Sequence, residues 1–212
     1  MYIPRSFAES DADVLQAFIE AHPFGVMVTS AGGLFATHMP FLLQRDSGQG
    51  GVLTGHIARA NEHHARVPAM SDVLVVFSGP DAHITPTWYP GKAESGKVVP
   101  TWNYVAVHVH GQLRFIDDPA FLWPHLERLT AQHESARGSA WTVNDPPPGY
   151  VDQQMHAIVG VEILVSRLEG KWKMSQNRSA QNVEGVIAGL RDSQAPMDAI
   201  VADIVDERRL RD

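Results

Sequence analysis

Three short segments combine residue types that bind phosphate groups and planar ligands. The first, residues 55–61, reads GHIARAN and joins a glycine, an arginine and an asparagine within seven positions. A glycine lets the backbone approach a ligand closely, and an arginine grips phosphate through a planar pair of N–H groups. An ordinary strand end with a surface arginine would look the same, and no established phosphate motif is present. Both interpretations of this segment stay open.

The second segment, residues 99–111, reads VPTWNYVAVHVHG. Trp102, Asn103 and Tyr104 are two polar-tipped rings and an amide beside an alternating strand. Such a group could frame a planar ligand, which needs aromatic walls and a few placed polar groups. It could equally be the edge of a core in which both rings bury area and satisfy their N–H and O–H groups.

The third segment, residues 171–178, reads KWKMSQNR. It places five hydrogen-bonding side chains in six positions, which suits a phosphate or the polar edge of a flavin. A solvated strand end would look similar. The only local excess of positive charge lies here too, and it is small enough to suit a phosphate group rather than a nucleic-acid duplex. The cations are Arg167, Lys171, Lys173 and Arg178, against the single acid Glu169.

The sequence gives little indication of a metal site or of a catalytic nucleophile. The chain has no cysteine, which excludes disulfides, thiolate metal sites and cysteine nucleophiles. Among its eleven histidines, His108 and His110 share a strand face and His63 and His64 are adjacent. No HExxH spacing accompanies them, and no GxSxG motif occurs. We therefore expect no metal site and name no catalytic residue, while a histidine that ligates haem stays open as an alternative.

Charge and length limit the class of protein. The net charge is −7, and both residues 1–178 (13 basic, 17 acidic) and residues 179–212 (4 basic, 7 acidic) are acidic. A nucleic-acid binder normally carries a basic face, so direct DNA binding is doubtful. The first residues lack the pattern of a secretory signal, and no apolar run reaches the ~20 residues of a membrane span. We expect a cytoplasmic protein without membrane segments.

The hydrophobic pattern predicts an α+β chain that is mainly β. Strand runs in hairpin order favour an antiparallel barrel, because closure removes exposed strand edges. A hairpin turn is expected at Gly32-Gly33, another turn at 46–51, and a strand buried on both faces at 72–79. The predicted strands span 24–30, 34–44, 52–58, 72–79, 81–89, 103–116 and 157–176; the predicted helices span 11–21, 118–135, 180–191 and 197–209.

Six blocks of the chain, taken in order, resemble the signature blocks of the PaiB-like family of FMN-binding negative transcriptional regulators. The resemblance runs from Met1 to about Leu190. It implies a split β-barrel like that of pyridoxamine-phosphate oxidases, with peripheral helices and a C-terminal helical segment. It also implies a homodimer with FMN at or near the subunit interface. The blocks are HMPF (38–41), TGHIARAN (54–61), FSGPDAHITPTWY (77–89), VPTWNYVAVHVHG (99–111), IVGVEI (158–163) and KMSQNR (173–178).

The resemblance also implies a flavin site built from these blocks. Arg59 and Asn61 would hold the FMN phosphate with the backbone of Ala58, Arg59 and Ala60. His38, Met39 and His56 would line the flavin side of the barrel. Trp102, Asn103 and Tyr104 would flank the ring system or the ribityl chain. Lys173, Ser175, Gln176 and Arg178 would complete the polar end.

We expect residues 1–178 to form the FMN-binding split-barrel domain and residues 179–212 a C-terminal helical extension packed on it. The function stays open between three classes. The first is a flavin-binding regulator or redox sensor. The second is an FMN-dependent oxidoreductase acting on a small molecule, for which the flavin would supply the chemistry. The third is a haem-binding or haem-degrading relative, supported only by the abundance of histidine.

Overall fold

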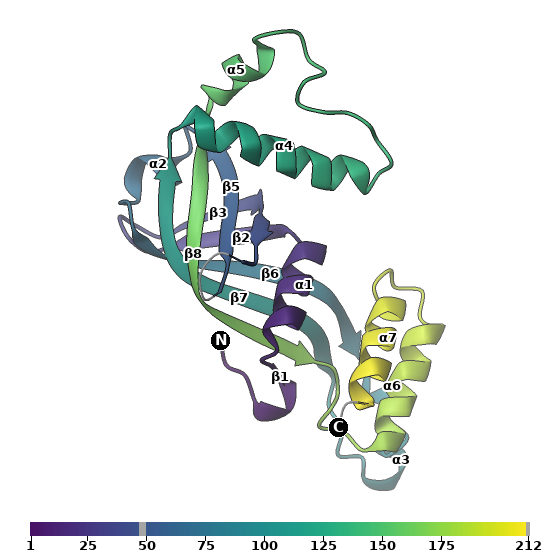
Figure 1. The fold of residues 1–212 in the computed structure, drawn as a ribbon. Helices are drawn as coiled ribbons and strands as arrows, with labels where there is room; N and C mark the ends of the chain where they lie inside the picture. The colour runs from purple at the N-terminus through teal and green to yellow at the C-terminus, as the bar shows by residue number, and fades with distance from the viewer. Residues whose placement is uncertain (47–49, 211–212) are drawn as a thin grey trace. The chain divides into compact units, whose positions relative to one another are not determined.

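The structure is a computed structural model that describes residues 1–46 and 50–210. The chain forms two compact units, which we describe separately. The terminal unit comprises Met1–Asp11, Ser78–Val107 and Glu169–Asp212, and the central unit comprises Ala12–Phe77 and His108–Leu168. Three strands, β6, β7 and β8, run from one unit into the other (Figure 1).

The strands form one sheet in the order β3-β2-β6-β7-β8-β5-β4, and β1 pairs with β8. The pairings β1–β8, β2–β3, β2–β6, β4–β5 and β5–β8 are all antiparallel. The predicted antiparallel, mainly β fold is therefore confirmed. The strands are β1 (Ala8–Glu9), β2 (Phe24–Thr29), β3 (Phe35–Pro40), β4 (Leu42–Gln44), β5 (Val52–Ala58), β6 (Ser71–Ile84), β7 (Thr101–Ile116) and β8 (Ile158–Lys173).

Helices connect the strands along the sequence, and two more follow the last strand. The predicted helix at 118–135 is confirmed, with Asp118 as its N-cap and Pro124 accommodated within it. The two predicted C-terminal helices are confirmed as well. The helices are η1 (Arg5–Phe7), α1 (Ala12–Ala21), α2 (Glu62–Arg66), η2 (Pro86–Trp88), α3 (Lys92–Ser95), α4 (Pro119–Ser135), α5 (Tyr150–Met155), α6 (Ala180–Asp192) and α7 (Asp198–Arg209).

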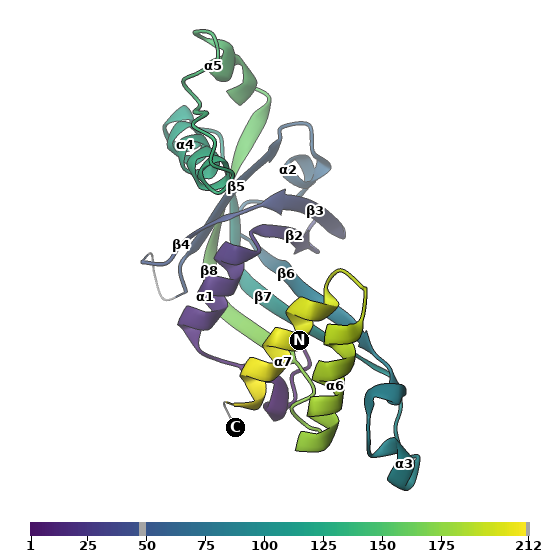
Figure 2. The same ribbon diagram turned by 90° about the vertical axis from the view of Figure 1, so that its right-hand side faces the viewer.

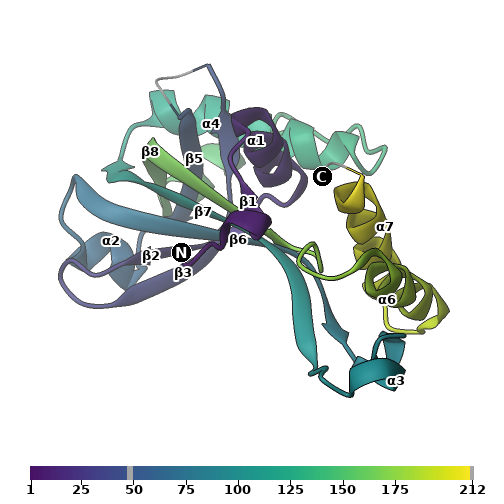
Figure 3. The same ribbon diagram turned by 90° about the horizontal axis from the view of Figure 1, so that it is seen from below.

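In the central unit, β2 and β3 form the predicted hairpin. Gly32 and Gly33 have φ values of 71° and 135°, a region that glycine adopts without steric cost. The turn predicted at 46–51 falls partly on residues 47–49, which lie outside the described residues. The expected meander is confirmed in part. The turn after the predicted strand 34–44 leads into an antiparallel pair, but β5 pairs there with the short β4. Along its whole length β5 also pairs with β8, a partner about a hundred positions away. Helix α2 lies beside β3 (Figure 3), and α4 lies beside β5 (Figure 1).

In the terminal unit, α6 and α7 lie side by side (Figures 1 and 2). Helix α6 also packs on η2, where Trp88 lies against Gly185 and Gly189. Arg208 of α7 donates to Glu9 of β1 at 2.6 Å and lies over the Trp172 ring at 4.8 Å. These contacts fix the C-terminal helical pair against the ends of β1 and β8.

Two strand predictions had different outcomes. The alternation in β7 is confirmed, because Val105, Val107 and Val109 are at most 2% exposed while the residues between them are half-buried. For β6, the predicted two strands are one. The expected burial on both faces is wrong, since Asp72 is exposed and the burial of its neighbours alternates along the strand. The described part of the predicted C-terminal extension, residues 179–210, is helical, and the domain boundary at residue 178 stays a prediction.

Candidate functional site

A small polar pocket in the terminal unit lies where β7 begins and β8 ends. The chain leaves β8 after Lys173 and turns at once, with Ser175 at a φ of 66° and the Arg178 N–H donating to the Ser175 carbonyl at 2.9 Å. This turn brings the last residues of the KMSQNR block back toward β7. The pocket has a volume of about 100 Å³ and is lined by Phe7, Thr101, Asn103, Lys173, Ser175, Asn177 and Arg178.

A hydrogen-bonded pair of side chains forms the buried part of this pocket. Asn103 is fully buried and Ser175 is 4% exposed. The Asn103 amide donates to Ser175 Oγ at 3.0 Å, and the hydroxyl can donate back to Asn103 Oδ1 at 3.2 Å. A buried pair that satisfies itself in this way is rigid and specific. Asn103 and Ser175 therefore shape the pocket rather than leave it as a flexible gap.

The ammonium group of Lys173 is held in place by two hydrogen bonds. It donates to Thr101 Oγ1 and to the Trp102 carbonyl. Burial lowers the pKa of Lys173, and the neighbouring charges of Lys171 and Arg178 lower it further. Both causes disfavour the charged form of the lysine, and an anion bound beside it would offset them.

The cations around this pocket are held by contacts other than ion pairs in the described part of the chain. Within residues 1–46 and 50–210, neither Lys171, Lys173 nor Arg178 forms an ion pair. Lys171 instead lies 5.1 Å from the centre of the Tyr104 ring and donates to the Tyr2 carbonyl at 3.1 Å. The Arg178 guanidinium lies 5.2 Å from the centre of the Tyr89 ring. Cation–π contacts of this kind hold a charged group in place without neutralising it.

This combination fits a phosphate group. A phosphate monoester carries between one and two negative charges near neutral pH and offers three acceptor oxygens. Lys173 and Arg178 supply charge, and Asn177 adds an amide at the pocket lining. An anion there would relieve the repulsion that lowers the Lys173 pKa. The phosphate end of FMN fits this donor set on charge and on hydrogen-bonding type.

The sequence prediction named four of the seven lining residues and missed the other three. Asn177 belongs to the KMSQNR block and Thr101 to the VPTWNY block, so both carried a sequence signal. Phe7 reaches the pocket from η1, and nothing in its surrounding sequence marks it. Gln176 lies outside this pocket, because its amide accepts from the Met174 N–H at 2.7 Å and donates to the Trp172 carbonyl at 2.6 Å.

The Trp102–Asn103–Tyr104 group does not act as one wall. Asn103 points to the buried side of β7, whereas Trp102 is 54% exposed and Tyr104 is half-buried on the other side. Trp102 meets His83 edge to face, with 5.6 Å between ring centres. Successive side chains of a strand point to opposite sides. Trp102 and Tyr104 therefore lie on the side of β7 opposite to Asn103.

The predicted site residues of the 38–61 region belong to the central unit, and Arg59 is already occupied there. Its guanidinium forms two 2.6 Å hydrogen bonds with Asp117 and donates to the carbonyls of His156 (2.9 Å) and Ile158 (3.0 Å). Its backbone N–H donates to Ala157. These bonds use four of the five guanidinium N–H groups, so Arg59 braces the end of β5 against the start of β8.

The neighbours of Arg59 have structural contacts as well. The Asn61 side chain accepts from the His63 N–H at 2.9 Å and caps α2, while Asn61 itself donates its backbone N–H to Ala58. Ala58 and Ala60 are exposed. The predicted roles of Asn61 and of the backbone of Ala58 and Ala60 in phosphate binding stay predictions.

His38, Met39 and His56 lie on different sides of their strands. His38 is exposed on β3, and Met39 is 3% exposed and fills the space beside Gly55. His56 on β5 shares a 3.1 Å hydrogen bond with His125 of α4. Burial lowers the pKa of both histidines, that of His125 to about 4. This His56–His125 pair has no counterpart in the sequence prediction.

The adjacent histidines of α2 diverge. His63 is 1% exposed and bonds Thr29 and Thr37 through its two ring nitrogens, at 3.0 and 2.9 Å. His64 turns instead to the Arg59 carbonyl, at 3.2 Å. His63 and His64 therefore bind different parts of the chain and do not converge on one point, as two ligands of a metal would.

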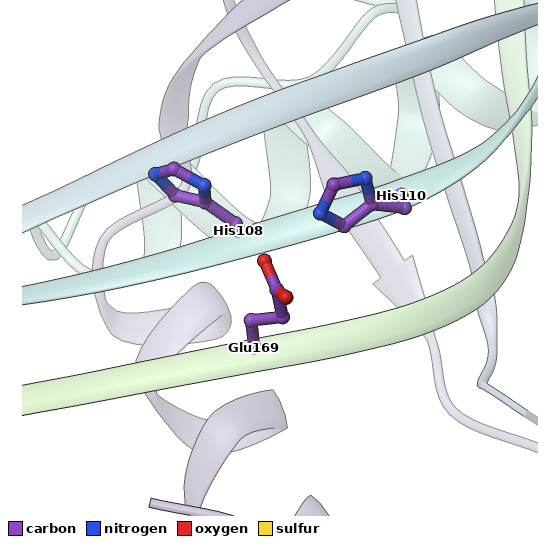
Figure 4. Close-up of side chains that lie close together, drawn as sticks. All are labelled: His108, His110 and Glu169. Carbon is purple, nitrogen blue, oxygen red and sulfur yellow. The ribbon is translucent and has the colours of Figure 1, made fainter. Parts of the chain in front are cut away.

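His108 and His110 are half-buried and lie on one side of β7 (Figure 4). The third side chain drawn there, Glu169, belongs to the terminal unit and accepts a 2.8 Å hydrogen bond from the amino group of Met1. The prediction that the chain holds no metal stays a prediction.

Comparison with known proteins places the chain in a family. The family model described as "Putative FMN-binding domain" matches residues 1–167. The Bacillus subtilis protein named protease synthase and sporulation protein PAI 2 is 31% identical, over 98% of this chain and 98% of that protein. An Emericella nidulans protein is 34% identical over 98% and 97% of the two chains. Among the described residues, no helix combines the length and hydropathy that crossing a membrane requires.

Solved structures share the fold at low identity. The flavocytochrome Anf3 from Azotobacter vinelandii aligns with a TM-score of 0.57 and 16% identity, over 81% of this chain and 72% of that one. The FAD and haem binding protein from Mycobacterium smegmatis aligns with a TM-score of 0.56 and 13% identity, over 86% and 80%. Together with the sheet order, this confirms the split β-barrel with peripheral and C-terminal helices. The chain belongs to the PaiB-like family of FMN-binding-domain split-barrel proteins.

Proposed function

We propose that this protein binds FMN, with the phosphate of the cofactor in the pocket lined by Lys173 and Arg178. The observation that carries the proposal is a set of cations, unpaired with any carboxylate of the described residues, beside a rigid Asn103–Ser175 pair. Uncompensated, partly buried charge is costly unless a ligand pairs with it. A phosphate monoester supplies the missing charge.

Family membership and the relatives support a flavin as the ligand. The matched family model is described as a "Putative FMN-binding domain". Two proteins with the same fold are named a flavocytochrome and an FAD and haem binding protein. In this chain Trp102, which is 54% exposed and follows the pocket residue Thr101, offers a ring face on which a planar group could stack. When bound, FMN supplies hydride or electron transfer by its own chemistry.

The output that we propose for the flavin is a redox-responsive regulatory role rather than DNA reading by this chain. The net charge of −7 opposes contact with a phosphate backbone. None of the residues around the pocket is an evident acid or base for a substrate: Lys173 is hydrogen-bonded to Thr101 and Trp102, and Ser175 to Asn103. An FMN-dependent oxidoreductase remains the alternative, and oxidation of NADH or NADPH by the FMN-loaded protein would favour it.

The proposal is tested by titrating FMN and riboflavin into the wild-type protein and into a Lys173→Gln variant. Riboflavin lacks the phosphate, so it isolates the contribution of the pocket. We expect Lys173→Gln to weaken FMN binding about tenfold or more, as for loss of a charge-assisted hydrogen bond. Riboflavin affinity should stay within a factor of two or so, which also shows that the variant is folded.

Arg59→Ala is the matched variant in the central unit. It also removes one positive charge, but from an arginine whose donors are used by Asp117, His156 and Ile158. We expect it to lower stability and to leave the ratio of FMN to riboflavin affinity unchanged. If Arg59→Ala abolishes that ratio while Lys173→Gln preserves it, the phosphate binds at Arg59 and the proposal is wrong.

A further inference from the structure

We propose that the terminal unit holds a second ligand site, for a small amphipathic carboxylate, in a pocket between the end of β8 and the helices α6 and α7. The pocket has a volume of about 210 Å³. Its residues follow position 167, the last that the family model matches. They are Met174, Gln176, Arg178, Ala180, Val183, Val205 and Arg209.

The charge available in this pocket comes from Arg178. Arg209 lines the pocket too, but its guanidinium lies 2.6 Å from Asp206 and 3.8 Å from Glu184, so its charge is balanced. The Arg178 guanidinium has the Tyr89 ring against one side and no ion pair among residues 1–46 and 50–210. Arginine binds carboxylates through two parallel N–H groups, which makes a carboxylate its natural partner here.

The remaining walls are apolar and well supported. Met174, Val183 and Val205 are at most 6% exposed, so their positions are set by packing in the core of this unit. The Gln176 amide is held by the backbone of residues 172 and 174, which leaves its stem toward the pocket. These side chains expose little surface of their own, so the gain comes from the ligand. A hydrocarbon part that leaves water to contact them is stabilised by its own burial, which an ion without such a part cannot achieve.

Size restricts the ligand further. Sites for drug-sized ligands and cofactors occupy about 300–1,000 Å³, so a pocket of about 210 Å³ is too small for a flavin ring system. A carboxylic acid with a short, branched apolar body meets the charge of Arg178 with one end and the valines with the other. The pocket therefore selects a ligand by charge and by apolar bulk together.

The test follows the methyl NMR signals of Val183 and Val205 in the full-length protein while 3-methylbutanoate is added. We expect saturable shifts at both valines. Acetate, which has the charge without the apolar body, and 3-methylbutanamide, which has the body without the charge, should bind about tenfold more weakly or not at all. Equal binding of the amide, or shifts spread over other methyl groups without Val183 and Val205, would overturn the proposal.

Ala180→Trp separates this pocket from the one proposed for the FMN phosphate beside Lys173, Asn177 and Arg178, which we call the cationic pocket. Ala180→Trp fills the pocket from an exposed position at the start of α6 and changes none of the residues around Lys173. We expect it to abolish the shifts at Val183 and Val205, as should Arg178→Gln. Arg137→Gln, at an exposed arginine of the central unit, removes the same charge and should change nothing.

The outcomes distinguish this proposal from that of FMN binding. If 3-methylbutanoate still binds to Ala180→Trp but not to Lys173→Gln, it occupies the cationic pocket and the second site is excluded. If Ala180→Trp loses 3-methylbutanoate and keeps FMN, both sites stand. A protein that binds 3-methylbutanoate but no FMN would support this site and contradict the FMN proposal.

Discussion

Lys173 and His125 are both bases with a lowered pKa, but their surroundings differ in kind. Lys173 lies among cations at the lining of a pocket, so an anion bound there would raise its pKa again. His125 is fully buried between α4 and β5, where it meets His56 and stacks on Phe121, and its Nδ1 has no hydrogen-bond partner. The position of Lys173 at a pocket indicates ligand binding. The buried His56–His125 contact indicates instead a packing contact whose stability depends on pH.

The histidine pair predicts how stability depends on pH. Burial lowers the pKa of His125 from 6.5 to about 4, so the unfolded chain binds a proton at higher pH than the folded chain. Stability from this group is fully present above pH 6.5 and is lost as the pH falls toward about 4. At about 1.4 kcal/mol per pKa unit the loss is on the order of 3 kcal/mol.

The free energy of unfolding in urea, measured from pH 7 down toward pH 4, checks this prediction. His125→Phe should remove that part of the decline, so that its stability relative to the wild type rises as the pH falls. His38→Gln, at an exposed histidine, should keep the wild-type slope. A difference between His125→Phe and the wild type that is the same at every pH would contradict the assignment.

At the scale of elements, the packing of α6 on η2 depends on two glycines one helical turn apart. A Cβ at Gly189 would lie 2.3 Å from the Trp88 ring, and one at Gly185 would lie 2.1 Å from the Trp88 carbonyl. This close approach fixes α6, and with it the walls of the pocket that it shares with α7 and the end of β8.

Gly189→Ala should therefore destabilise the protein. In a free helix the change would stabilise by about 1 kcal/mol, but overpacking in a filled site costs about 1–3 kcal/mol. Urea unfolding of Gly189→Ala in the wild type and in a Trp88→Ala background separates the two effects. We expect Gly189→Ala to lower the free energy of unfolding in the wild type, and to raise it or leave it unchanged in the Trp88→Ala background. A gain in both would show that Trp88 does not restrict α6.

Local patterns in the sequence predict these elements better than they predict their partners. The alternation of β7 and the capped helix α4 follow from neighbouring residues, and both are confirmed. The pairing of β5 with β8 and the contact of Arg59 with Asp117, 58 positions away, join residues that are distant in the sequence. Such contacts exist only in the folded chain. For the same reason the KMSQNR block indicated the cationic pocket, whereas neither Phe7 nor the His56–His125 pair could be foreseen.

At the scale of the whole molecule, the distribution of charge supports the proposed small-molecule ligand. The chain is acidic overall, and yet Lys171, Lys173 and Arg178 of the terminal unit form no ion pair within the part of the chain that the structure describes. The family and the split barrel are shown, while the homodimer implied by the resemblance to this family stays a prediction. Sedimentation of the purified protein would distinguish one chain of 23.3 kDa from two.

We propose above all that the phosphate group of FMN binds in the cationic pocket. The most direct measurement is the pair of dissociation constants for FMN and riboflavin on the purified wild-type protein, followed by flavin absorbance or fluorescence. Two charge-assisted contacts predict that FMN binds about a hundredfold tighter or more. Equal affinities for the two flavins, or no binding of FMN, would contradict the account.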